Sequence, residues 1–222
     1  MDAAQKPRVL FLYYTFTQQA LKVTEDMESV FRDRGWEMER AQIEFTDARY
    51  KDRFAKFPLQ HRYLDIIRLL PGQLRRATGE IRIPEQAKSG DYDLVVIGSP
   101  TWWLTTCMPI RSYLKSPEAK AFLKGKKFGA FVVCRRYWKN NLQTVQKLAE
   151  ENGGTCVEVT HFKYLGGQVR SLLSLISYLG TGEYRDKYLG VKIPPTNLQA
   201  DGDEAARVFA TKLADQLAAK AG

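Results

Sequence analysis

The stretch that most constrains the fold is residues 93–104, Asp-Leu-Val-Val-Ile-Gly-Ser-Pro-Thr-Trp-Trp-Leu. Its apolar run, residues 94–97, is too short for a typical helix and is rich in β-branched side chains, so it predicts a buried strand. The run stops at Gly98-Ser99-Pro100, and helical spacing resumes near Pro109, which suits a first helical turn. A buried strand that leads through a turn into a helix is typical of a parallel α/β sheet. Ligands of such sheets bind beyond the carboxyl ends of the strands.

Strands and helices alternate along the rest of the chain, which predicts a doubly wound parallel sheet. Apolar runs and alternating patterns predict strands over residues 9–14, 36–45, 94–97, 128–134 and 155–162. Helical spacing of apolar residues predicts helices over 20–34, 59–77, 109–116, 142–149 and 205–217. The Pro71-Gly72 pair is expected to kink or split the second of these helices.

Length and charge narrow the class of protein. The 222 residues, 44% of them hydrophobic, suffice for one sizeable core, so we expect a single domain over residues 1–222 with inserted segments. The net charge of +9 favours an anionic partner such as a phosphate-bearing cofactor, an acidic protein or an acidic membrane surface. Net charge alone would also suit nucleic acid, but no nucleic-acid motif accompanies it, so we do not expect that partner.

The three cysteines, Cys107, Cys134 and Cys156, have no metal-type spacing, and we expect no metal site. Their odd number fits a reducing compartment better than a disulfide framework. The sequence shows no apolar signal region before the first strand and no run of about 18 apolar residues. These features predict a soluble, cytoplasmic protein.

Two segments are inserted into the alternating pattern, at residues 44–90 and 163–200. In the first segment, residues 59–77 have two interpretations. We favour a crossover helix with a solvated charged face. The alternative is a basic amphipathic element that docks on a membrane or covers a ligand. Within the insert 44–58 before this helix, residues 50–58 form either a lid or plain surface. The extension 163–200 is too apolar for a linker, so it packs on the sheet edge or forms a dimer contact.

Three strand ends should meet at one edge of the sheet, after Tyr14, Gly98 and Cys134. The first loop offers hydroxyl and amide side chains directly before a helix N-terminus, an arrangement that suits a phosphate, although plain N-capping is an alternative. The second loop offers two indoles, and the third offers two guanidinium groups and two rings. A phosphate at one end and a flat ring system at the other is the outline of a bound mononucleotide.

These residues resemble flavodoxin-like FMN proteins, of the flavodoxin and NAD(P)H-dependent FMN reductase type. The motifs that carry the resemblance are Tyr-Tyr-Thr-Phe-Thr-Gln-Gln at 13–19 and Gly-Ser-Pro-Thr-Trp-Trp at 98–103, with residues 134–137 in a matching position. The likeness covers most of the chain except 44–58 and 163–200. Residues 93–180 are similar, more loosely, to flavodoxin-related proteins labelled dialkylresorcinol condensing enzymes.

The resemblance implies a three-layer sandwich with a five-stranded parallel sheet of order 2-1-3-4-5. It implies that the FMN phosphate lies on the first loop and the isoalloxazine ring between the other two. The FMN-binding residues implied in this way are Thr15, Thr17, Gln18, Gln19, Ala20, Pro100, Thr101, Trp102, Trp103, Leu104, Cys134, Arg135, Arg136 and Tyr137.

The first loop departs from the family pattern at two positions. The family usually has glycine where this chain has Gln18 and often has threonine where it has Ala20. A side chain at position 18 either crowds the phosphate or requires an unusual backbone angle.

The arginines of the third loop favour an enzyme. A guanidinium group from Arg135 or Arg136 near the isoalloxazine would stabilise the anionic reduced flavin, whereas electron-carrier flavodoxins are acidic. We therefore expect an FMN-dependent oxidoreductase that takes a hydride from NADPH or NADH and reduces a quinone or cyclic enone-like molecule stacked on Trp102 or Trp103. Tyr137 is the candidate catalytic proton donor. Surface salt bridges for the arginines and a packing role for Tyr137 are the alternatives.

Other functions stay open at this stage. A one-electron carrier flavodoxin would pause at a one-electron stage during stepwise reduction. A flavin-free binding module would explain Gln18 and Ala20 as loss of the phosphate site. The candidate partners are a small-molecule electron acceptor, a second copy of the chain, and a membrane surface contacted through the basic insert.

Overall fold

The computed structural model describes residues 6–50, 54, 57–196 and 202–219. Its central sheet has five parallel strands in the order β2-β1-β5-β7-β8, which confirms the predicted order 2-1-3-4-5. A short sixth strand, β6, pairs antiparallel with β5. The strands of this sheet are β1 Arg8–Tyr13, β2 Glu37–Gln42, β5 Leu94–Trp102, β6 Thr105–Thr106, β7 Lys127–Cys134 and β8 Thr155–Lys163.

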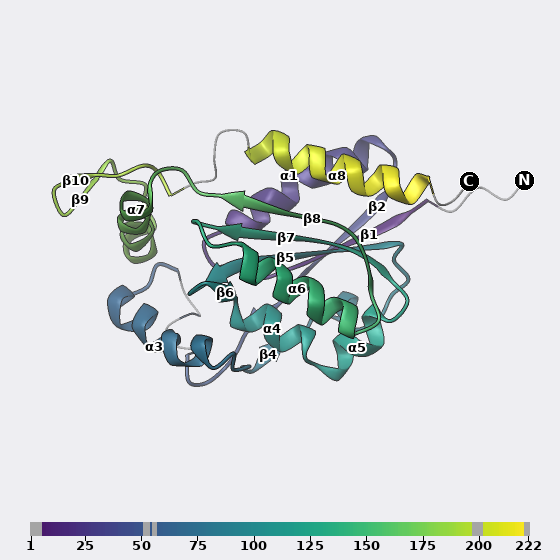
Figure 1. Cartoon of the computed structure of the whole chain (residues 1–222), viewed down its shortest axis with the longest axis horizontal. Coiled ribbons are helices and arrows are strands. Elements are labelled where there is room, and N and C mark those ends of the chain that lie inside the picture. Colours follow the sequence, from purple (N-terminus) through teal and green to yellow (C-terminus); the bar gives the residue numbers. More distant parts are fainter. Residues whose placement is uncertain (1–5, 51–53, 55–56, 197–201, 220–222) are drawn as a thin grey trace, which may run out of the picture.

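Helices cover both faces of the sheet (Figure 1). On one face, α1 (Gln19–Asp33) and α8 (Gly202–Ala218) bury Phe31 and Leu213. On the other lie α4 (Met108–Leu114), α5 (Pro117–Leu123) and α6 (Lys139–Glu151). Among the described residues, no helix is long and apolar enough to cross a membrane.

The remaining elements belong to the two inserted segments. Helices α3 (Arg62–Leu74) and α7 (Gln168–Thr181) lie at the left of Figure 1, beyond the carboxyl ends of β5, β7 and β8. The short elements are β3 Glu44–Phe45, β4 Ile81–Arg82, the 3-10 helix η1 Glu85–Ala87, β9 Lys187–Tyr188 and β10 Val191–Lys192.

Two strand predictions were wrong in extent. The single strand predicted over 36–45 is two strands in the structure. Strand β2 ends at Gln42, which pairs with Tyr13, the last residue of β1, and β3 then pairs antiparallel with β4. The strand predicted over 94–97 is longer in the structure, because β5 continues to Trp102. The last residue of β5 that pairs with β1 is Gly98. Pro100 lies beyond it, where the β1 side of β5 has no strand partner among the described residues, so the missing N–H of proline is tolerated.

Two helix predictions also need correction. Ser116-Pro117 ends α4 but begins α5, because the Ser116 hydroxyl caps the helix by accepting the Ala119 N–H at 3.1 Å and proline suits the first turn. Helix α3 is shorter than the predicted 59–77 and is not split at Pro71. Pro71 has no N–H to offer the Ile67 carbonyl, but only three residues of the helix follow it, to Leu74.

Replacing Gly98 by alanine is expected to lower the free energy of unfolding by about 2 kcal/mol. A Cβ atom at Gly98 would lie 2.4 Å from Cζ of Phe131, a fully buried ring that has nowhere to move. Urea unfolding measures the loss. Gly167→Ala is the control, since a Cβ there meets no atom within 4 Å. A Gly98→Ala, Phe131→Leu double variant should lose less than the sum of the single variants; additive losses would contradict the predicted clash.

Candidate functional site

The loop after β1 leads into the N-terminus of α1 with its backbone amides free. The first helical hydrogen bond runs from the Lys22 N–H to the Gln18 carbonyl at 3.0 Å. The amides of Gln19, Ala20 and Leu21 therefore lie in the first turn, where a helix has no carbonyl partner to offer. This first turn also contains no acidic residue. The local dipole and the free N–H groups together suit an anion.

Gln18 adopts the left-handed conformation, with φ of 63°. The loop thus keeps a backbone angle that favours glycine, at a cost of about 1 kcal/mol for a residue with a Cβ. The Gln18 side chain makes no capping hydrogen bond. Gln19 is buried, and its Oε1 has no hydrogen-bond partner among the described residues. This orphaned oxygen requires a donor that the neighbouring protein groups do not supply.

Tyr164, which the sequence analysis did not single out, lies beside the start of the third loop. Its N–H donates to the Cys134 carbonyl at 3.0 Å. Burial raises the pKa of the Tyr164 phenol. Its place directly after the last strand of the sheet is the one sequence signal that could have identified it.

The second loop is a tight hairpin between β5 and β6. Thr101 pairs with Thr106 and Trp102 with Thr105, so Trp103 and Leu104 are its two turn residues. Both have positive φ, 44° and 67°, as a two-residue turn of the left-handed type requires. Bulky residues are rarely found there, and each costs about 1–2 kcal/mol.

Helix α3 and helix α4 hold this strained hairpin in place. The Trp103 indole N–H donates to the Ile66 carbonyl at 2.9 Å. The Gln73 amide donates to the Trp102 carbonyl at 3.2 Å and to the Thr106 carbonyl at 3.3 Å. Arg111 donates to the same Thr106 carbonyl and, at 2.7 Å, to Oε1 of Gln73.

Arg111 is a buried cation, 1% exposed, with no carboxylate within 4.0 Å among the described residues. Besides Gln73 and Thr106, it donates to the Ala77 carbonyl at 2.8 Å. Burial lowers the pKa of the guanidinium group. Its bonds go to backbone and amide oxygens of three segments, so Arg111 acts as a positioning residue for the hairpin that carries the two indoles.

The two indoles have separate environments. The Trp102 ring packs in an aromatic cluster, 5.5 Å from the Tyr14 ring, 5.6 Å from Phe54 and 6.1 Å from Phe45. Trp103 is 37% exposed.

Of the insert 44–58, residues 51–53 and 55–56 lie outside the described residues, but Phe54 is in the core. This part of the insert is packing material rather than plain surface.

The third loop contacts the start of α7 through Gln168. Arg135 donates to the Gln168 carbonyl, and Arg136 lies 3.5 Å from its Oε1. The Gln168 amide donates to the Tyr137 phenol oxygen at 3.1 Å. The structure does not support salt bridges for the two arginines, because no described carboxylate lies within 4.0 Å of either. Burial lowers the pKa of Arg135 and raises the pKa of the Cys134 thiol to about 12.

In the extension 163–200, helix α7 packs against the first insert. The Leu59 N–H donates to the Leu179 carbonyl at 2.6 Å, and the Tyr178 ring lies 5.1 Å from Phe57. Residues 197–200 lie outside the described residues. These contacts are with the first insert and not with an edge strand, so packing on the sheet edge and a dimer contact both stay predictions.

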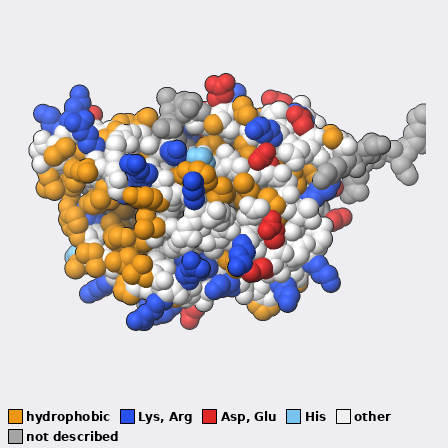
Figure 2. All heavy atoms as spheres, in the orientation of Figure 1, with side chains coloured by type: hydrophobic (Ala, Val, Ile, Leu, Met, Phe, Trp, Pro, Cys, Tyr) orange, Lys and Arg blue, Asp and Glu red, His pale blue; other side chains and the backbone are white. Residues whose placement is uncertain are grey.

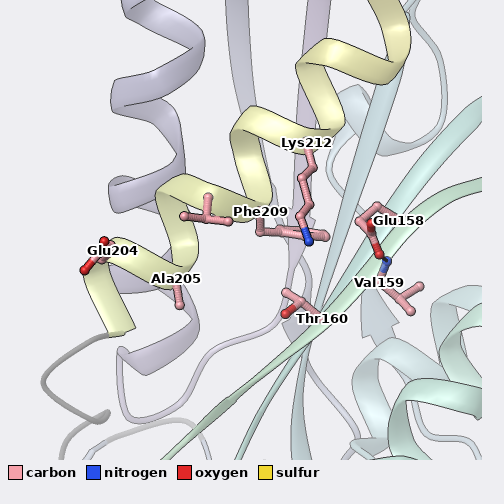
Figure 3. A pocket seen from close by; sticks show the side chains of 8 residues that line it. Glu158, Val159, Thr160, Glu204, Ala205, Phe209 and Lys212 are labelled. Atoms are coloured by element: carbon pink, nitrogen blue, oxygen red, sulfur yellow. Dashed lines mark hydrogen bonds between the residues drawn. The ribbon is translucent and has the colours of Figure 1, made fainter.

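The predicted residues of all three loops thus lie at the carboxyl edge of the sheet. Ala20 is buried in α1, Pro100 pairs with β7, and the Thr101 hydroxyl accepts from the Asn141 amide at 2.9 Å. Two cavities lie elsewhere. One of about 340 Å³ lies between β8 and α8, with Lys212 and Glu158 among its lining residues (Figure 3). The other, of about 550 Å³, is lined by residues of 76–83 and 112–118.

Comparison with known proteins identifies the fold. No protein-family model matches the chain. No curated protein matches it. Among solved structures, oxidised flavodoxin 1 from Bacillus cereus is 12% identical, with 94% of this chain and 97% of that chain covered and a TM-score of 0.52. A flavoprotein from Lactobacillus acidophilus NCFM, in complex with FMN, is 19% identical over 70% and 93%, with a TM-score of 0.51. A flavodoxin from the domain Archaea is 9% identical over 95% and 99%, with a TM-score of 0.50. The chain has a flavodoxin-like fold.

Proposed function

We propose that this chain binds FMN at the carboxyl edge of its sheet and reduces a small quinone or cyclic enone by two electrons, with NADPH or NADH as donor. The observation that carries the proposal is the pair of arginines after β7. Neither Arg135 nor Arg136 has a described carboxylate partner, and Arg135 is half-buried. A half-buried cation at a ligand edge favours an anionic form of whatever binds beside it.

The residues present fit the parts of FMN. The free amides of the first turn of α1 and the left-handed Gln18 suit a phosphate. The orphaned Oε1 of Gln19 suits the hydroxyl donors of a polyol chain. Trp103 and Tyr137, both partly exposed, are the rings available for stacking, whereas Trp102 is already packed. When bound, FMN would supply the hydride-transfer chemistry.

The protein groups would bind, orient and move protons. Thr15, Thr17 and the amides of residues 19–21 would hold the phosphate. The Arg135 guanidinium would stabilise negative charge on the ring edge. The Tyr137 oxygen already accepts a hydrogen bond from Gln168, so its own hydrogen is free to be donated to a substrate oxygen.

A one-electron carrier is the second candidate, because the solved structures of this fold include flavodoxins. The net charge of +9 argues against it, since we expect carriers to be acidic. A flavin-free binding module is the third, suggested by Gln18 and Ala20.

Spectroscopy separates the three. The protein is mixed with FMN, desalted, and titrated with NADPH or NADH and then with a naphthoquinone. We expect the flavin absorbance to be retained, to bleach with the nicotinamide and to return with the quinone. Indifference to both nicotinamides, with a long-wavelength band during chemical reduction, would support the carrier. A colourless protein after desalting would support the binding module.

Arg135→Gln is expected to lower the two-electron potential of bound FMN by about 30–60 mV, which corresponds to about 1.4–2.8 kcal/mol of lost charge stabilisation. Arg135→Lys is the matched variant, because it keeps the charge but loses the forked donor geometry that reaches Gln168. Equilibrium redox titration measures both. Equal potentials in the two variants would mean that the contact with α7, and not the charge, is what Arg135 contributes.

A further inference from the structure

Helix α3 buries Asp65 and Gln73 beside Leu69 and exposes several apolar side chains, which is unusual for a surface helix of a soluble protein. Asp65 and Gln73 are 2% and 1% exposed. Leu64, Ile67 and Leu74 are 54%, 58% and 70% exposed. Arg68 and Arg75 are exposed, as the interpretation of a crossover helix with a solvated charged face predicts, but exposed apolar side chains lie among them.

The β9–β10 hairpin adds a second apolar element next to α3. Leu189 is in its turn, with φ of 48°, and is 74% exposed, and Val191 follows it on the surface. The hairpin is joined to α3 because the phenol oxygens of Tyr63 and Tyr188 are hydrogen-bonded and Arg62 donates to Tyr188 at 3.1 Å. Hydrophobic side chains gather at this end of the molecule, at the left of Figure 2.

Cations surround these apolar residues. Arg68 and Arg75 are exposed on α3, and Lys187 and Lys192 flank the hairpin turn. The one acidic residue of α3 is the buried Asp65. Before the hairpin, Glu183 is paired with Arg185 at 3.5 Å. Asp186, next to Lys187, is also exposed, so the exposed part of this surface is hydrocarbon within a rim of predominantly positive charge.

We infer that this surface, formed by the outer face of α3 and the β9–β10 hairpin, docks on an anionic lipid bilayer. Aliphatic side chains beside arginine and lysine are the composition of elements that lie in a membrane interface. A second copy fits poorly, because face-to-face packing would bring Arg68 and Arg75 against cations of the partner. Nucleic acid fits poorly, because Leu64, Ile67 and Leu189 offer neither charge nor a stacking face.

The docking surface adjoins the loops that would hold the flavin, since the Trp103 indole is bonded to α3. A lipid-soluble quinone is then the acceptor class that docking favours. This last step rests on the proposed function; the docking itself does not.

Vesicle co-sedimentation of the full chain, without FMN, tests the docking. We expect binding to vesicles of phosphatidylcholine with phosphatidylglycerol to be at least about tenfold tighter than to phosphatidylcholine alone, and to weaken with salt. A Leu64→Glu, Leu189→Glu variant should lose at least about tenfold in affinity. An Arg68→Gln, Arg75→Gln variant should lose about 30-fold on the anionic vesicles.

Matched controls come from the opposite helical layer. Val208→Glu changes a valine that is 49% exposed on α8, and Arg32→Gln changes an exposed arginine on α1; both should bind vesicles like the parent. Thermal unfolding verifies that every variant is folded. Absence of vesicle binding by the parent, or equal losses in the controls, would overturn the docking. The docking would also be overturned if the protein is a dimer that Leu64→Glu dissociates and no vesicle binding is observed. Because FMN is absent, failure here leaves the flavin proposal standing, and success does not support it.

Discussion

Replacing Gln18 by glutamate is expected to weaken FMN binding by about 10- to 100-fold, while the affinity for riboflavin, which lacks the phosphate, stays unchanged. The two side chains have the same shape, so the substitution adds one negative charge at the N-terminus of α1 and nothing else. Repulsion between that charge and a phosphate held by the first-turn amides corresponds to about 1.4–2.8 kcal/mol. Flavin fluorescence quenching, measured in parallel with both flavins, gives the two affinities.

The same substitution should stabilise the protein without flavin by about 0.5 kcal/mol, because a carboxylate at a helix N-terminus interacts favourably with the helix dipole. Opposite signs for stability and FMN affinity distinguish a charge effect from damage to the loop. Gln18→Gly is the control, since glycine adopts the observed φ of 63° without strain. Equal weakening of FMN and riboflavin by glutamate would place the phosphate away from this loop.

Replacing Arg111 by methionine is expected to lower the free energy of unfolding by about 2–4 kcal/mol. Methionine fills a similar volume but leaves the Ala77 carbonyl and Oε1 of Gln73 without their buried donor. Removal of an unpaired buried charge acts in the opposite direction, and Nε of Arg111 has no hydrogen-bond partner among the described residues. The two terminal nitrogens, however, bond to three oxygen acceptors. We therefore expect the lost hydrogen bonds to dominate.

Urea unfolding measures the stability, and tryptophan emission reports on the hairpin. The emission maximum of Trp103 should move to longer wavelength if its turn loosens. Arg68→Met is the matched control, because this arginine is exposed on α3 and should be within about 0.5 kcal/mol of the parent. A variant as stable as the parent, or more stable, would show that burial of the Arg111 charge costs more than its bonds return.

The sequence could predict the sheet because its signals are local. The β-branched runs at residues 94–97 and 128–134 require no distant partner to be recognised as strands, and alternation with helices predicts parallel pairing. The resemblance to flavodoxins implied the strand order, which the structure confirms. A side chain at position 18 was expected either to crowd the phosphate or to require an unusual backbone angle. The structure shows the unusual angle.

The contacts between the loops could not be read from the sequence. Gln168 joins the third loop to α7 through hydrogen bonds that depend on where this helix packs. Arg111 appeared as one basic residue in a short helix, and its burial depends on the hairpin and α3 closing over it. Phe54 packs on Trp102 although 48 residues separate them along the chain.

By itself, then, the sequence determined the parallel sheet, the three loops at its carboxyl edge and the basic character of the first insert. Only the tertiary structure decided which face of α3 is buried. Periodicity places Leu64, Ile67 and Leu74 on one stripe, and a stripe is normally assigned to the core. In the folded protein the core side of α3 holds Leu69 together with the buried Asp65 and with Gln73, which bonds to the hairpin. Leu64, Ile67 and Leu74 face outward because the Gln73 amide, on the inner side of the helix, donates to the carbonyl groups of Trp102 and Thr106.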